Sequence, residues 1–409
     1  MTTKPLTALD CNEFWSPSGG GVRRYHLEKM AFFRKQNADT VRHIMVMPGP
    51  EARTEQTGPD TYIEHVPAFK FPGNWEYRLC PSTRALRAVI LRHRPDVIEV
   101  GSPYLLPGRI LSIVDELPEA DRPRIVGFWH SDFPVTYVGR FFARFSRMLG
   151  GMTEAMAWMY ARRRYNRMDA ILVPSRLILE RLRLNGLQNL HHVPLGVDSR
   201  TFTPAALDES RVADLKAGMP GRLTIFFGHR FAEEKGLRTF LKAYPEICAR
   251  LGHEPAVVFA GTGPDLDLVQ AAVKANAHMR YIGFVRSPQE MAAWYASCHM
   301  GLALSGWETF GLSILEAMAC GQILIGVNQG AAREHIEDSA GNGGAGLTIP
   351  VADPKALAEA VEKLWNDRGS WQERSRKAVA YAQRLTWERC FEREVEIYRN
   401  LATRGSNEK

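Results

Sequence analysis

The sequence predicts two doubly wound α/β units, each built on a parallel sheet. Short apolar or β-branched runs alternate with helical patterns along the chain, and this alternation occurs twice. The length of 409 residues suits two units of ordinary size. Between the halves lies a polar segment that contains Pro204, Pro220 and Gly221, which indicates a linker. We therefore expect two sheets, each with a core of its own.

The predicted strands divide evenly between the two halves. The N-terminal half, residues 1–198, is predicted to have strands at 41–47, 97–100, 125–128, 170–173 and 192–194. After a linker at 199–222, the C-terminal half, residues 223–384, is predicted to have strands at 223–228, 256–261, 281–283, 300–304 and 323–327. Near the end of the chain, Phe391, Val395 and Tyr398 recur on one stripe, which predicts a terminal helix over 387–401.

Charge is unevenly distributed along the chain. Residues 1–200 hold 28 Lys and Arg against 20 Asp and Glu, whereas residues 201–409 hold 24 against 25. The net charge of +7 therefore belongs to the N-terminal half. Nucleic acid and anionic lipid both attract a basic surface, so charge alone does not identify the partner.

Composition also limits the compartment and the chemistry. The chain has no uninterrupted apolar segment of the roughly 18 residues needed to span a bilayer, and its first residues lack the apolar core of a signal peptide. We therefore expect a cytoplasmic protein. The six cysteines include no C-x-x-C pair, and the pair His191 and His192 adjoins a predicted strand. We expect reduced thiols and no metal site.

The run from Ser305 to Gly321 is the most informative part of the chain. It reads SGWETFGLSILEAMACG and contains Glu308 and, eight positions later, Glu316. Gly311 opens a predicted helix, so Glu308 precedes the helix and Glu316 lies inside it. A helix start attracts a diphosphate, and carboxylates accept hydrogen bonds from sugar hydroxyls. Two isolated glutamates would more often be solvated surface residues, but this context predicts a site for a nucleoside diphosphate sugar.

These residues resemble the E-x7-E signature of the retaining glycosyltransferases of family 4, whose GT-B fold has two Rossmann-like domains facing across a cleft. The resemblance spans most of the chain and is strongest over 173–334. Further motifs carry it: PLGVD at 194–198, GHRFAEEKG at 228–236, GTGP at 261–264 and NQGAARE at 328–334. It implies an acceptor-binding domain at 1–198, with a helix at 385–402 packing back onto it, and a donor-binding domain at 223–384.

The resemblance implies a hexosyltransferase that retains the anomeric configuration and needs neither a metal nor another cofactor. Arg230 and Lys235 would bind the donor diphosphate and stabilise the charge that grows on the leaving group. Glu308 would contact the hexose and Glu316 the ribose. His130, directly after a predicted strand, matches a histidine that contacts the transferred sugar in this family, although a lone histidine at a strand end is more often structural.

The other predicted contacts with the donor include backbone that a ligand can approach closely. Gly20 and Gly21 belong to a glycine loop before a predicted helix. The chain has no G-x-G-x-x-G motif, so a nicotinamide dinucleotide is not expected. The sequence at 265–267 matches the D-x-D metal motif superficially, but we expect Asp265 to cap a helix instead. The remaining predicted contacts with the donor are Gly263, Phe310, Gly311, Leu312 and Ser313.

Residues 138–168 form a basic and apolar segment. They hold seven arginines against one acid, Glu154, and the pattern places Arg140, Arg144 and Arg147 at helical spacing beside Phe and Met residues. Such an amphipathic helix suits an anionic membrane surface, while an ordinary helix that packs on its own domain is the alternative. We therefore expect an acceptor associated with the membrane, and a protein that lies peripherally on the inner face of the plasma membrane.

The expected reaction moves a hexose from a donor of the GDP-mannose or UDP-glucose type to a glycolipid, a diacylglycerol-type lipid or a polyprenyl-linked saccharide. Base selection would depend on the loop at 283–286. A soluble acceptor, such as a small polyol or an oligosaccharide, is the first alternative. A catalytically silent protein that binds sugar nucleotides or nucleic acid is a more remote one, and the absence of an aromatic RNA-binding motif argues against nucleic acid as a partner.

Overall fold

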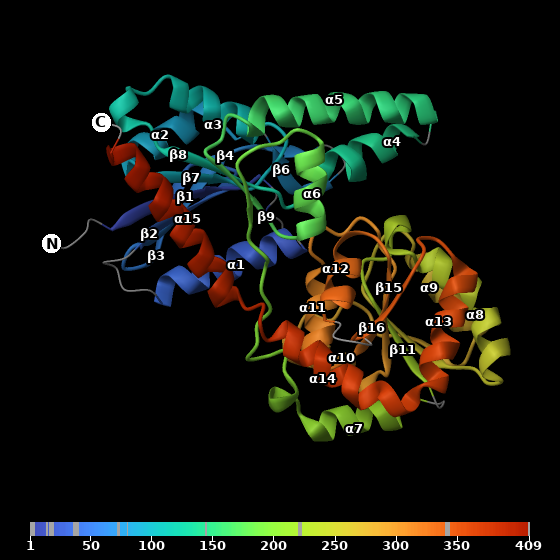
Figure 1. Cartoon of the computed structure of the whole chain (residues 1–409). Helices are drawn as coiled ribbons and strands as arrows, with labels where there is room; N and C mark the ends of the chain where they lie inside the picture. The colour runs from blue at the N-terminus through green and yellow to red at the C-terminus, as the bar shows by residue number, and fades with distance from the viewer. Residues whose placement is uncertain are drawn as a thin grey trace. The chain divides into compact units, whose positions relative to one another are not determined.

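A computed structural model of the chain describes residues 5–13, 15, 20–35, 41–71, 74–79, 81–143, 145–219, 223–339 and 344–407. The chain forms two compact units (Figure 1). Unit 1 comprises residues 1–195 and 387–409, and unit 2 comprises residues 196–386. Residues 199–222, expected as a linker, hold helix α7 (Glu209–Ala217) and belong to unit 2.

Unit 1 is built on a mixed sheet. Within the described residues, the strand order is β10-β9-β8-β7-β1-β2-β4-β3, and every pair is parallel except β3 with β4. A separate antiparallel pair joins β5 and β6. The strands of unit 1 are β1 (Leu6–Cys11), β2 (Val41–Gly49), β3 (Arg53–Gly58), β4 (Thr61–Pro67), β5 (Phe69–Phe71), β6 (Asn74–Leu79), β7 (Val97–Val100), β8 (Arg124–Phe128), β9 (Ala170–Val173) and β10 (Leu190–His192).

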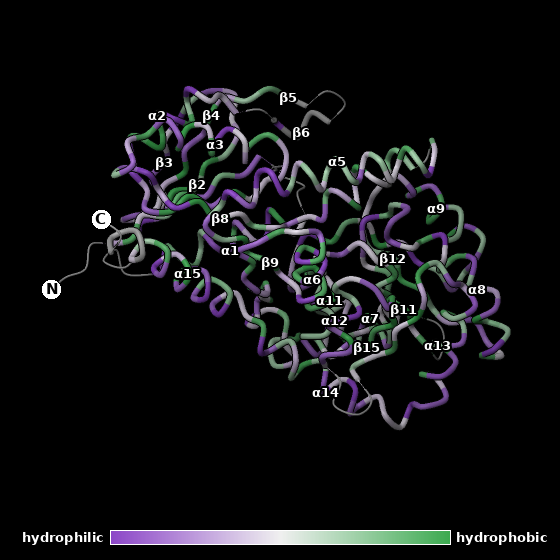
Figure 2. The backbone as a smooth tube through the Cα atoms, turned by 45° about the horizontal axis from the view of Figure 1, so that its top comes forward, coloured by the Kyte–Doolittle hydropathy of each residue, from purple (hydrophilic) through white to green (hydrophobic). Residues whose placement is uncertain are grey.

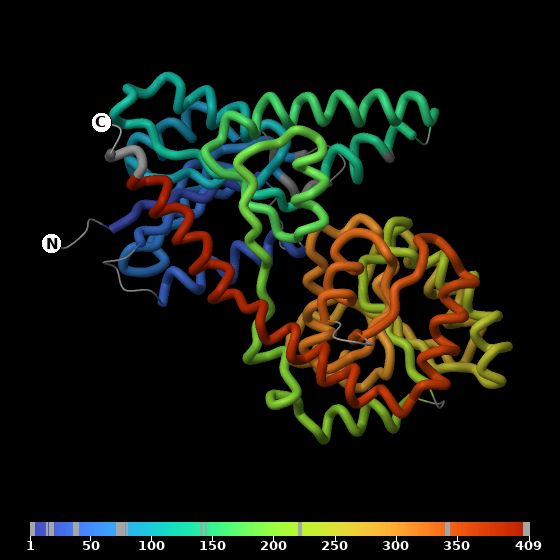
Figure 3. The backbone as a smooth tube through the Cα atoms, viewed as in Figure 1, coloured from blue at the N-terminus to red at the C-terminus, as the bar shows by residue number. Residues whose placement is uncertain are grey.

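Helices cover both faces of this sheet. One face packs on α2, α3, α5 and α6, through a core that includes Ile98, Ile110, Trp158 and Leu182. The opposite face lies towards α1 and α15, which lie side by side, although α15 comes from the other end of the chain (Figure 3). The helices of unit 1 are α1 (Gly21–Lys35), α2 (Thr83–His93), α3 (Leu106–Asp115), η1 (Glu119–Asp121), η2 (Pro134–Gly139), α4 (Arg140–Ala143), α5 (Arg147–Tyr165), α6 (Arg176–Leu184) and α15 (Trp387–Asn407).

Unit 2 is built on a wholly parallel sheet. Within the described residues, its strand order is β13-β12-β11-β14-β15-β16. Segments of hydrophobic residues lie in its interior around β11 (Figure 2). Phe226, Phe227 and Phe259 are fully buried there. The strands are β11 (Thr224–Gly228), β12 (Ala256–Ala260), β13 (Met279–Tyr281), β14 (Met300–Ala303), β15 (Ile323–Val327) and β16 (Gly346–Ile349).

The helices of unit 2 follow its strands in the alternation that the sequence predicts. They are α7, α8 (Leu237–Leu251), α9 (Leu266–Ala275), α10 (Pro288–Ser297), α11 (Leu312–Ala319), α12 (Gly330–Asp338), α13 (Pro354–Asn366) and α14 (Trp371–Ala382), with short turns η3 (Pro204–Ala206), η4 (Glu233–Lys235) and η5 (Arg368–Ser370). The predicted fold class, two doubly wound parallel-sheet units, is therefore confirmed.

Each predicted strand overlaps a strand of the structure, but the set was incomplete. The ranges predicted as 192–194 and 281–283 lie two residues too late, because β10 ends at His192 and β13 at Tyr281. The sequence analysis missed β1, β3 to β6 and β16. Of these, β3 has an exposed, polar sequence without an apolar period, which explains why no pattern marked it.

The predicted amphipathic helix is interrupted, which corrects the expectation of one helical face through Arg140, Arg144 and Arg147. Helix α4 ends at Ala143 and α5 begins at Arg147. Residue 144 and the side chain of Arg140 lie outside the described part of the chain. A Cβ atom at Gly150 would lie only 2.7 Å from the Cβ of Ala143, so this glycine lets α4 fold back against α5.

A buried ionic cluster lies on the face of the unit 1 sheet that carries α1 and α15. The Nζ atom of Lys29 lies 3.1 Å from Asp10, 3.0 Å from Glu99 and 2.9 Å from Glu394, and all four side chains are at most 1% exposed. Strands β1 and β7 place Asp10 directly beside Glu99, and α15 supplies Glu394. The hydroxyl of Tyr398 also accepts a hydrogen bond from Lys29.

Candidate functional site

The predicted donor-binding residues of unit 2 include residues in loops beside the point where the order of its strands reverses. The chain proceeds from β11 outward to β13 and then returns to β14 on the other side of β11. In open α/β sheets, ligands bind beyond the carboxyl ends of the strands at such a switch point. Arg230 and Lys235 follow β11, and Glu308 follows β14, so both flanking loops carry predicted site residues.

Lys235 and Glu308 form an ion pair across this switch point. Gly236, directly after Lys235, has φ +76°, and a Cβ atom there would lie 2.5 Å from the Cβ of Leu304. The glycine therefore lets the two loops touch. Burial raises the pKa of Glu308, but the charge and hydrogen bond of Lys235, together with His229 and His335, outweigh burial, and the pKa ends below its ordinary value. Both side chains remain about one-fifth exposed and within reach of a ligand.

Two glycines allow close backbone contacts on either side of Arg230. A Cβ atom at Gly261 would lie 2.0 Å from the carbonyl oxygen of His229, and one at Gly263 would lie 2.3 Å from that of Phe231. Arg230 lies between these two contacts, so its backbone is fixed while its side chain is exposed. Its guanidinium forms no ion pair with any residue that the structure describes. Gly263 thus has a structural reason to be glycine.

The D-x-D-like segment is confined to the start of α9. Asp265 occupies the N-cap position as expected, but its side chain makes no capping hydrogen bond. One of its carboxylate oxygens instead accepts a hydrogen bond of 2.8 Å from Arg238. No group of three potential metal ligands occurs among the residues with described positions.

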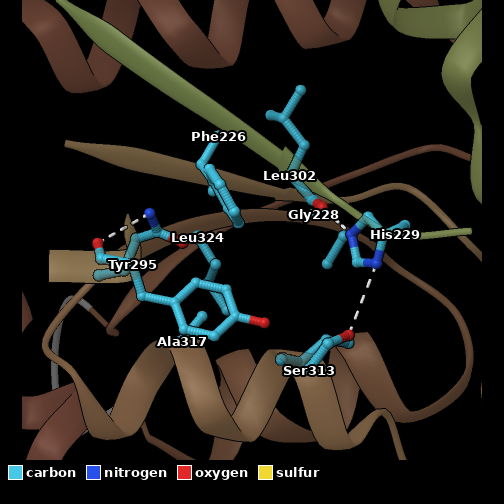
Figure 4. A pocket seen from close by; sticks show the side chains of 12 residues that line it. Phe226, Gly228, His229, Tyr295, Leu302, Ser313, Ala317 and Leu324 are labelled. Atoms are coloured by element: carbon cyan, nitrogen blue, oxygen red, sulfur yellow. Dashed lines mark hydrogen bonds between the residues drawn. The ribbon is translucent and has the colours of Figure 1, made fainter. Parts of the chain in front are cut away.

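Helix α11 begins shortly after Glu308 in the sequence. It carries Leu312, Ser313 and Glu316. Gly311 has φ +80° and precedes the helix, a conformation that favours glycine. The hydroxyl of Ser313 lies 3.5 Å from Nδ1 of His229, whose other ring nitrogen meets the carbonyl oxygen of Leu302 (Figure 4). Burial and the charge of Lys235 lower the pKa of His229, so its ring is neutral.

Behind the ion pair, Phe310 and His335 hold the loop before α11. Nε2 of His335 donates to the carbonyl oxygen of Phe310 at 2.6 Å, and its Nδ1 meets the hydroxyl of Tyr381 at 3.0 Å. The amide of Ala331 donates to the carbonyl oxygen of Glu308 at 3.2 Å. The buried ring of Phe310 therefore anchors the loop. The sequence analysis did not assign His335 a role, although it lies just beyond the NQGAARE motif.

Glu316 lies on α11, one turn after Ser313, and is half-buried. After burial, its negative charge is the largest cause that raises the pKa values of Tyr295 and Cys320. Tyr295 lines a small cavity between the sheet and α11, together with Gly228 and Ala317 (Figure 4). The sequence analysis missed Tyr295 because α10 shows no feature that distinguishes this tyrosine from a core residue.

In unit 1, the predicted site residues lie at the carboxyl end of the sheet. Gly21 begins α1, and His130 follows β8 and stacks on Phe128 with ring centroids 4.1 Å apart. Burial, followed by the neighbouring His26 and Lys29, lowers the pKa of His130 well below its usual range. A Cβ atom at Gly20 would meet nothing within 4 Å, so the protein leaves open space beside this backbone.

Comparisons with known proteins agree with this architecture. A family model described as Glycosyltransferase Family 4 matches residues 19–201, and one described as Glycosyl transferases group 1 matches residues 216–385. Among solved structures, a sucrose-phosphate synthase from Thermosynechococcus elongatus aligns with a TM-score of 0.74 over 97% of this chain and 99% of that one, at 16% identity. HepE from Anabaena, in complex with UDP, aligns with a TM-score of 0.70 over 97% of this chain and all of HepE, also at 16% identity.

Curated relatives extend over the same two units. The chain is 27% identical to the GDP-mannose-dependent alpha-(1-6)-phosphatidylinositol dimannoside mannosyltransferase of Mycobacterium tuberculosis over 403 residues, 94% of each chain. It is 24% identical to a GDP-mannose-dependent alpha-mannosyltransferase of Corynebacterium glutamicum, over 94% of this chain and 86% of that one. A D-inositol 3-phosphate glycosyltransferase of Paenarthrobacter aurescens is 27% identical over 53% of each chain, so the match spans about half of that relative.

Two parallel-sheet units, with charged and glycine-rich loops beyond the strands of the second, define a glycosyltransferase of the GT-B fold. The chain belongs to glycosyltransferase family 4 and is a hexosyltransferase.

Proposed function

We propose that this enzyme transfers mannose from GDP-mannose to a glycolipid acceptor at an anionic membrane surface. The observation that carries the proposal is the pairing of Lys235 with Glu308 at the switch point of the unit 2 sheet, with exposed Arg230 on the same loop as Lys235. Two relatives aligned over nearly the whole chain are named as GDP-mannose-dependent mannosyltransferases, which favours GDP-mannose over UDP-glucose.

The proposed chemistry assigns charge stabilisation to unit 2. Arg230 and Lys235 bind the diphosphate and offset the negative charge that develops on the departing GDP. Glu308 and Glu316 accept hydrogen bonds from sugar hydroxyls. Transfer retains the anomeric configuration by front-face displacement: a donor phosphate oxygen takes the proton of the acceptor hydroxyl, the new glycosidic bond forms, and the bond to GDP breaks. The reaction needs no metal, because Arg230, Lys235 and the start of α11 supply the positive charge.

Donor choice is tested by thermal unfolding with GDP, UDP and ADP. A ligand at about a hundred times its dissociation constant stabilises the folded state by about 2.7 kcal/mol, so the nucleotide that fits should give a clear shift. We expect the largest shift with GDP, and we expect GDP-mannose to release GDP slowly without acceptor. A larger shift with UDP would transfer the proposal to a UDP-sugar, and no shift with any of the three would contradict it.

The proposed membrane surface is an exposed apolar stripe on α5. Met148, Met152, Met156 and Met159 recur at helical spacing, and each is more than half exposed. Contiguous exposed apolar surface marks an interaction site more often than a solvated face. Phe141 and Phe145, exposed on α4 and in the following turn, extend the apolar character of this region.

The charge of α5 supports an anionic lipid bilayer as the occupant of this stripe. Arg147 lies at the start of α5 and Arg162 and Arg163 near its end, and all three are exposed. The acid of α5, Glu154, is half-buried and accepts a hydrogen bond of 3.3 Å from Trp158. A basic helix with an exposed apolar stripe suits the interface of an anionic bilayer. No helix in the described residues is long and apolar enough to cross a membrane.

Vesicle flotation tests this surface. We expect the protein to float with anionic vesicles. The triple variant Met152→Ser, Met156→Ser and Met159→Ser should lose flotation and activity on a lipid acceptor but keep the slow hydrolysis of the donor. Leu184→Ser is the matched control, because Leu184 is 86% exposed on another helix of unit 1. Equal flotation of the triple variant would remove the membrane from the proposal, and equal flotation of the wild type with neutral and anionic vesicles would remove the anionic charge from it.

A soluble acceptor is the second candidate, favoured by the similarity to a D-inositol 3-phosphate glycosyltransferase. The discriminating experiment offers inositol phosphate and phosphatidylinositol mannoside in vesicles to the same preparation. Transfer to the soluble compound alone, unchanged in the triple serine variant, would select this candidate.

A further inference from the structure

His229 is a partly buried histidine at the switch point of the unit 2 sheet, and the proposed chemistry does not use it. It lies between the end of β11 and Arg230. Its amide donates to the carbonyl oxygen of Ala260, at the end of β12, at a distance of 3.1 Å. Its own carbonyl oxygen occupies space that is open only because residue 261 is a glycine. The backbone of His229 is therefore held against the neighbouring strand.

The ring of His229 joins two elements that flank the proposed position of the diphosphate. Nε2 meets the carbonyl oxygen of Leu302 on β14, and Nδ1 lies 3.5 Å from the hydroxyl oxygen of Ser313 in the first turn of α11 (Figure 4). A carbonyl oxygen can only accept, so Nε2 carries the ring proton of the neutral imidazole. Nδ1 is then an acceptor, and the hydroxyl of Ser313 donates to it in a long hydrogen bond.

The charge state of His229 depends on the ion pair beside it. Burial, followed by the charge of Lys235, lowers the pKa of His229. The hydrogen bond to Leu302 and the carboxylate of Glu308 act in the opposite direction but do not outweigh these two causes. The ring is therefore neutral, with a cation close to it. An anion that binds Lys235 offsets this repulsion and adds an attraction of its own.

Arg230 and Tyr295 also lie near this ring. Arg230 follows His229 in the chain and is exposed, so solvent and salt screen its charge. Tyr295 lines the same cavity as His229 and Ser313, and burial raises the pKa of its hydroxyl well above the usual range. Neither side chain takes up a proton near neutral pH. Among the described residues around the cavity and the ion pair, His229 and Glu308 remain as the groups that a bound anion can protonate.

We propose that His229 takes up one proton when a nucleoside diphosphate sugar binds, and that Ser313 relays its positive charge to the diphosphate. Nδ1 gains the proton from solvent and donates it in a hydrogen bond to Oγ of Ser313. The serine hydroxyl then turns and donates its own proton in a hydrogen bond to a phosphate oxygen. Nε2 keeps its hydrogen bond to Leu302 throughout, so the ring does not have to rotate.

Protonated His229 adds to the charge that stabilises the departing nucleoside diphosphate. Arg230 and Lys235 supply permanent charges, whereas His229 becomes charged only when the anion is present. A cation that forms on binding costs the free protein no repulsion between His229 and Lys235. This inference deepens the proposed function and rests on it, because it requires the donor diphosphate to lie at the start of α11.

The number of protons taken up on binding is the direct test. Isothermal titration with GDP-mannose, or with UDP-glucose if thermal unfolding selects it, is performed in buffers of different ionisation enthalpy. These donors have no terminal phosphate, so the ligand itself does not titrate near neutral pH. We expect an uptake of about one proton at about pH 6, and an affinity that falls by up to about tenfold per pH unit as the pH rises through the pKa of the bound histidine. Binding without proton uptake would overturn this inference alone, whereas no binding of either donor would contradict the proposed function and this inference with it.

Three variants identify the group that takes up the proton. His229→Gln keeps an N–H donor for the carbonyl of Leu302 but does not ionise, so the donor should bind without proton uptake and with nearly constant affinity from about pH 6 to about pH 8. Ser313→Ala removes the relay and should also lose the uptake. Glu308→Gln should keep the full uptake, although Glu308 loses Lys235 to the phosphates in the proposed complex. Uptake that persists in His229→Gln and disappears in Glu308→Gln would assign the proton to the glutamate and overturn the proposal.

His278→Gln is the matched control. His278 directly precedes β13, at the amino edge of the same sheet, and its side chain is 35% exposed and lies 3.5 Å from Glu254. This variant should keep the proton uptake of the wild type. Nitrogen NMR of the wild type with labelled histidines needs no variant at all. We expect Nδ1 of His229 to change from a bare nitrogen to an N–H when the donor binds, and a bare Nδ1 in the complex at about pH 6 would overturn the proposal.

Discussion

Lys235 and Glu308 show how a single ion pair can prepare a site for an anionic ligand. The carboxylate of Glu308 neutralises the ammonium group of Lys235. When a diphosphate binds, Lys235 can pair with phosphate and leave Glu308 for a sugar hydroxyl. Glu316 has a different position, on α11 beyond the loop, and we assign it to the ribose.

These assignments predict unequal effects of the two glutamates on nucleotide affinity. Glu316→Ala removes an ionised acceptor of hydrogen bonds and should weaken GDP binding at least about tenfold, since such bonds contribute about 1.5–3 kcal/mol. Glu308→Gln releases Lys235 for the phosphates, so GDP affinity should stay within about twofold while kcat falls. Isothermal titration measures the GDP affinity of both variants, and equal losses of affinity would contradict the division of roles.

Glu99, in the buried cluster of unit 1, has a raised pKa, which favours its protonated form. Burial raises its pKa to about 8, against the opposing charge of Lys29. The hydrogen bonds agree, because the single hydroxyl proton of Tyr25 cannot serve both Glu99 at 3.0 Å and Glu394 at 2.8 Å. If Tyr25 donates to Glu394, the carboxylic acid of Glu99 donates to the oxygen of Tyr25.

The raised pKa predicts a definite pH dependence for Glu99→Gln. Between about pH 5 and 8, the folded chain holds a proton on Glu99 that the unfolded chain has lost, so this group makes stability fall as pH rises. The lowered pKa of Asp10 affects stability at more acidic pH, and the raised pKa of Lys29 at more alkaline pH. Glutamine cannot ionise, so urea unfolding should show the stability of Glu99→Gln increasing relative to the wild type from pH 5 to 8. A constant difference would show that Glu99 is already ionised.

The sequence predicted the parts of these residue-scale features that are local. Lys235, Glu308 and Glu316 lie in contiguous motifs, so pattern and resemblance were enough to select them. Lys29, Asp10, Glu99 and Glu394 come from four elements, and no spacing along the chain shows that they meet. A signal was present, because Asp10 and Glu99 interrupt otherwise apolar strands that a parallel sheet buries on both faces. Read in that way, each acid would have required a buried cation.

At the scale of elements, α15 is held to unit 1 by both apolar and ionic contacts. Phe391 and Tyr398 are fully buried, as the predicted stripe requires, and Trp387 stacks on Phe391 with ring centroids 5.6 Å apart. The ring of Phe391 also contacts the ring of Tyr25 on α1, with centroids 5.7 Å apart. Glu394 adds a charge that the stripe did not reveal, since it pairs with Lys29.

Removing that charge should loosen the whole helix. Glu394→Ala leaves Lys29 with fewer partners in a dry environment, and breaking a buried ion pair costs about 3 kcal/mol. Glu396→Ala is the matched control on the same helix, because Glu396 is 57% exposed and pairs only with Arg393 among the described residues; its effect should stay within about 0.5 kcal/mol. Chemical denaturation compares the two, and equal unfolding free energies would show that α15 is held by its apolar stripe alone.

The interrupted α4–α5 segment marks where element prediction failed. No proline stands in 140–150, so the periodicity continued through the break. The amides of Phe145 and Ser146 both donate to the carbonyl oxygen of Phe142, which closes a turn, and Ser146 is extended with φ −163°. This tertiary packing against Gly150 overrides the local helical preference. The break does not affect the methionine stripe on α5, because all residues of the stripe follow the break in the sequence.

At the scale of the whole molecule, the two units have separate cores and unlike charge. The basic excess belongs to the first 200 residues, whereas the predicted donor-binding residues other than Gly20 and Gly21 lie in 196–386. This separation was predictable, because each half repeats its own strand and helix pattern. The proposed function assigns nucleotide binding mainly to unit 2, and this division can be measured.

Hydrogen exchange in the presence of GDP should therefore change unevenly along the chain. GDP at about a hundred times its dissociation constant adds about 2.7 kcal/mol to the opening of amides in the unit that binds it, which slows their exchange about a hundredfold. We expect this in β11, β14 and α11 of unit 2, while the buried strands β2 and β9 of unit 1 exchange as before. Glu316→Ala, at the same GDP concentration, should lose most of the protection. Equal slowing in β9 and β11 would mean that the nucleotide stabilises both units together and that the division of binding between them is wrong.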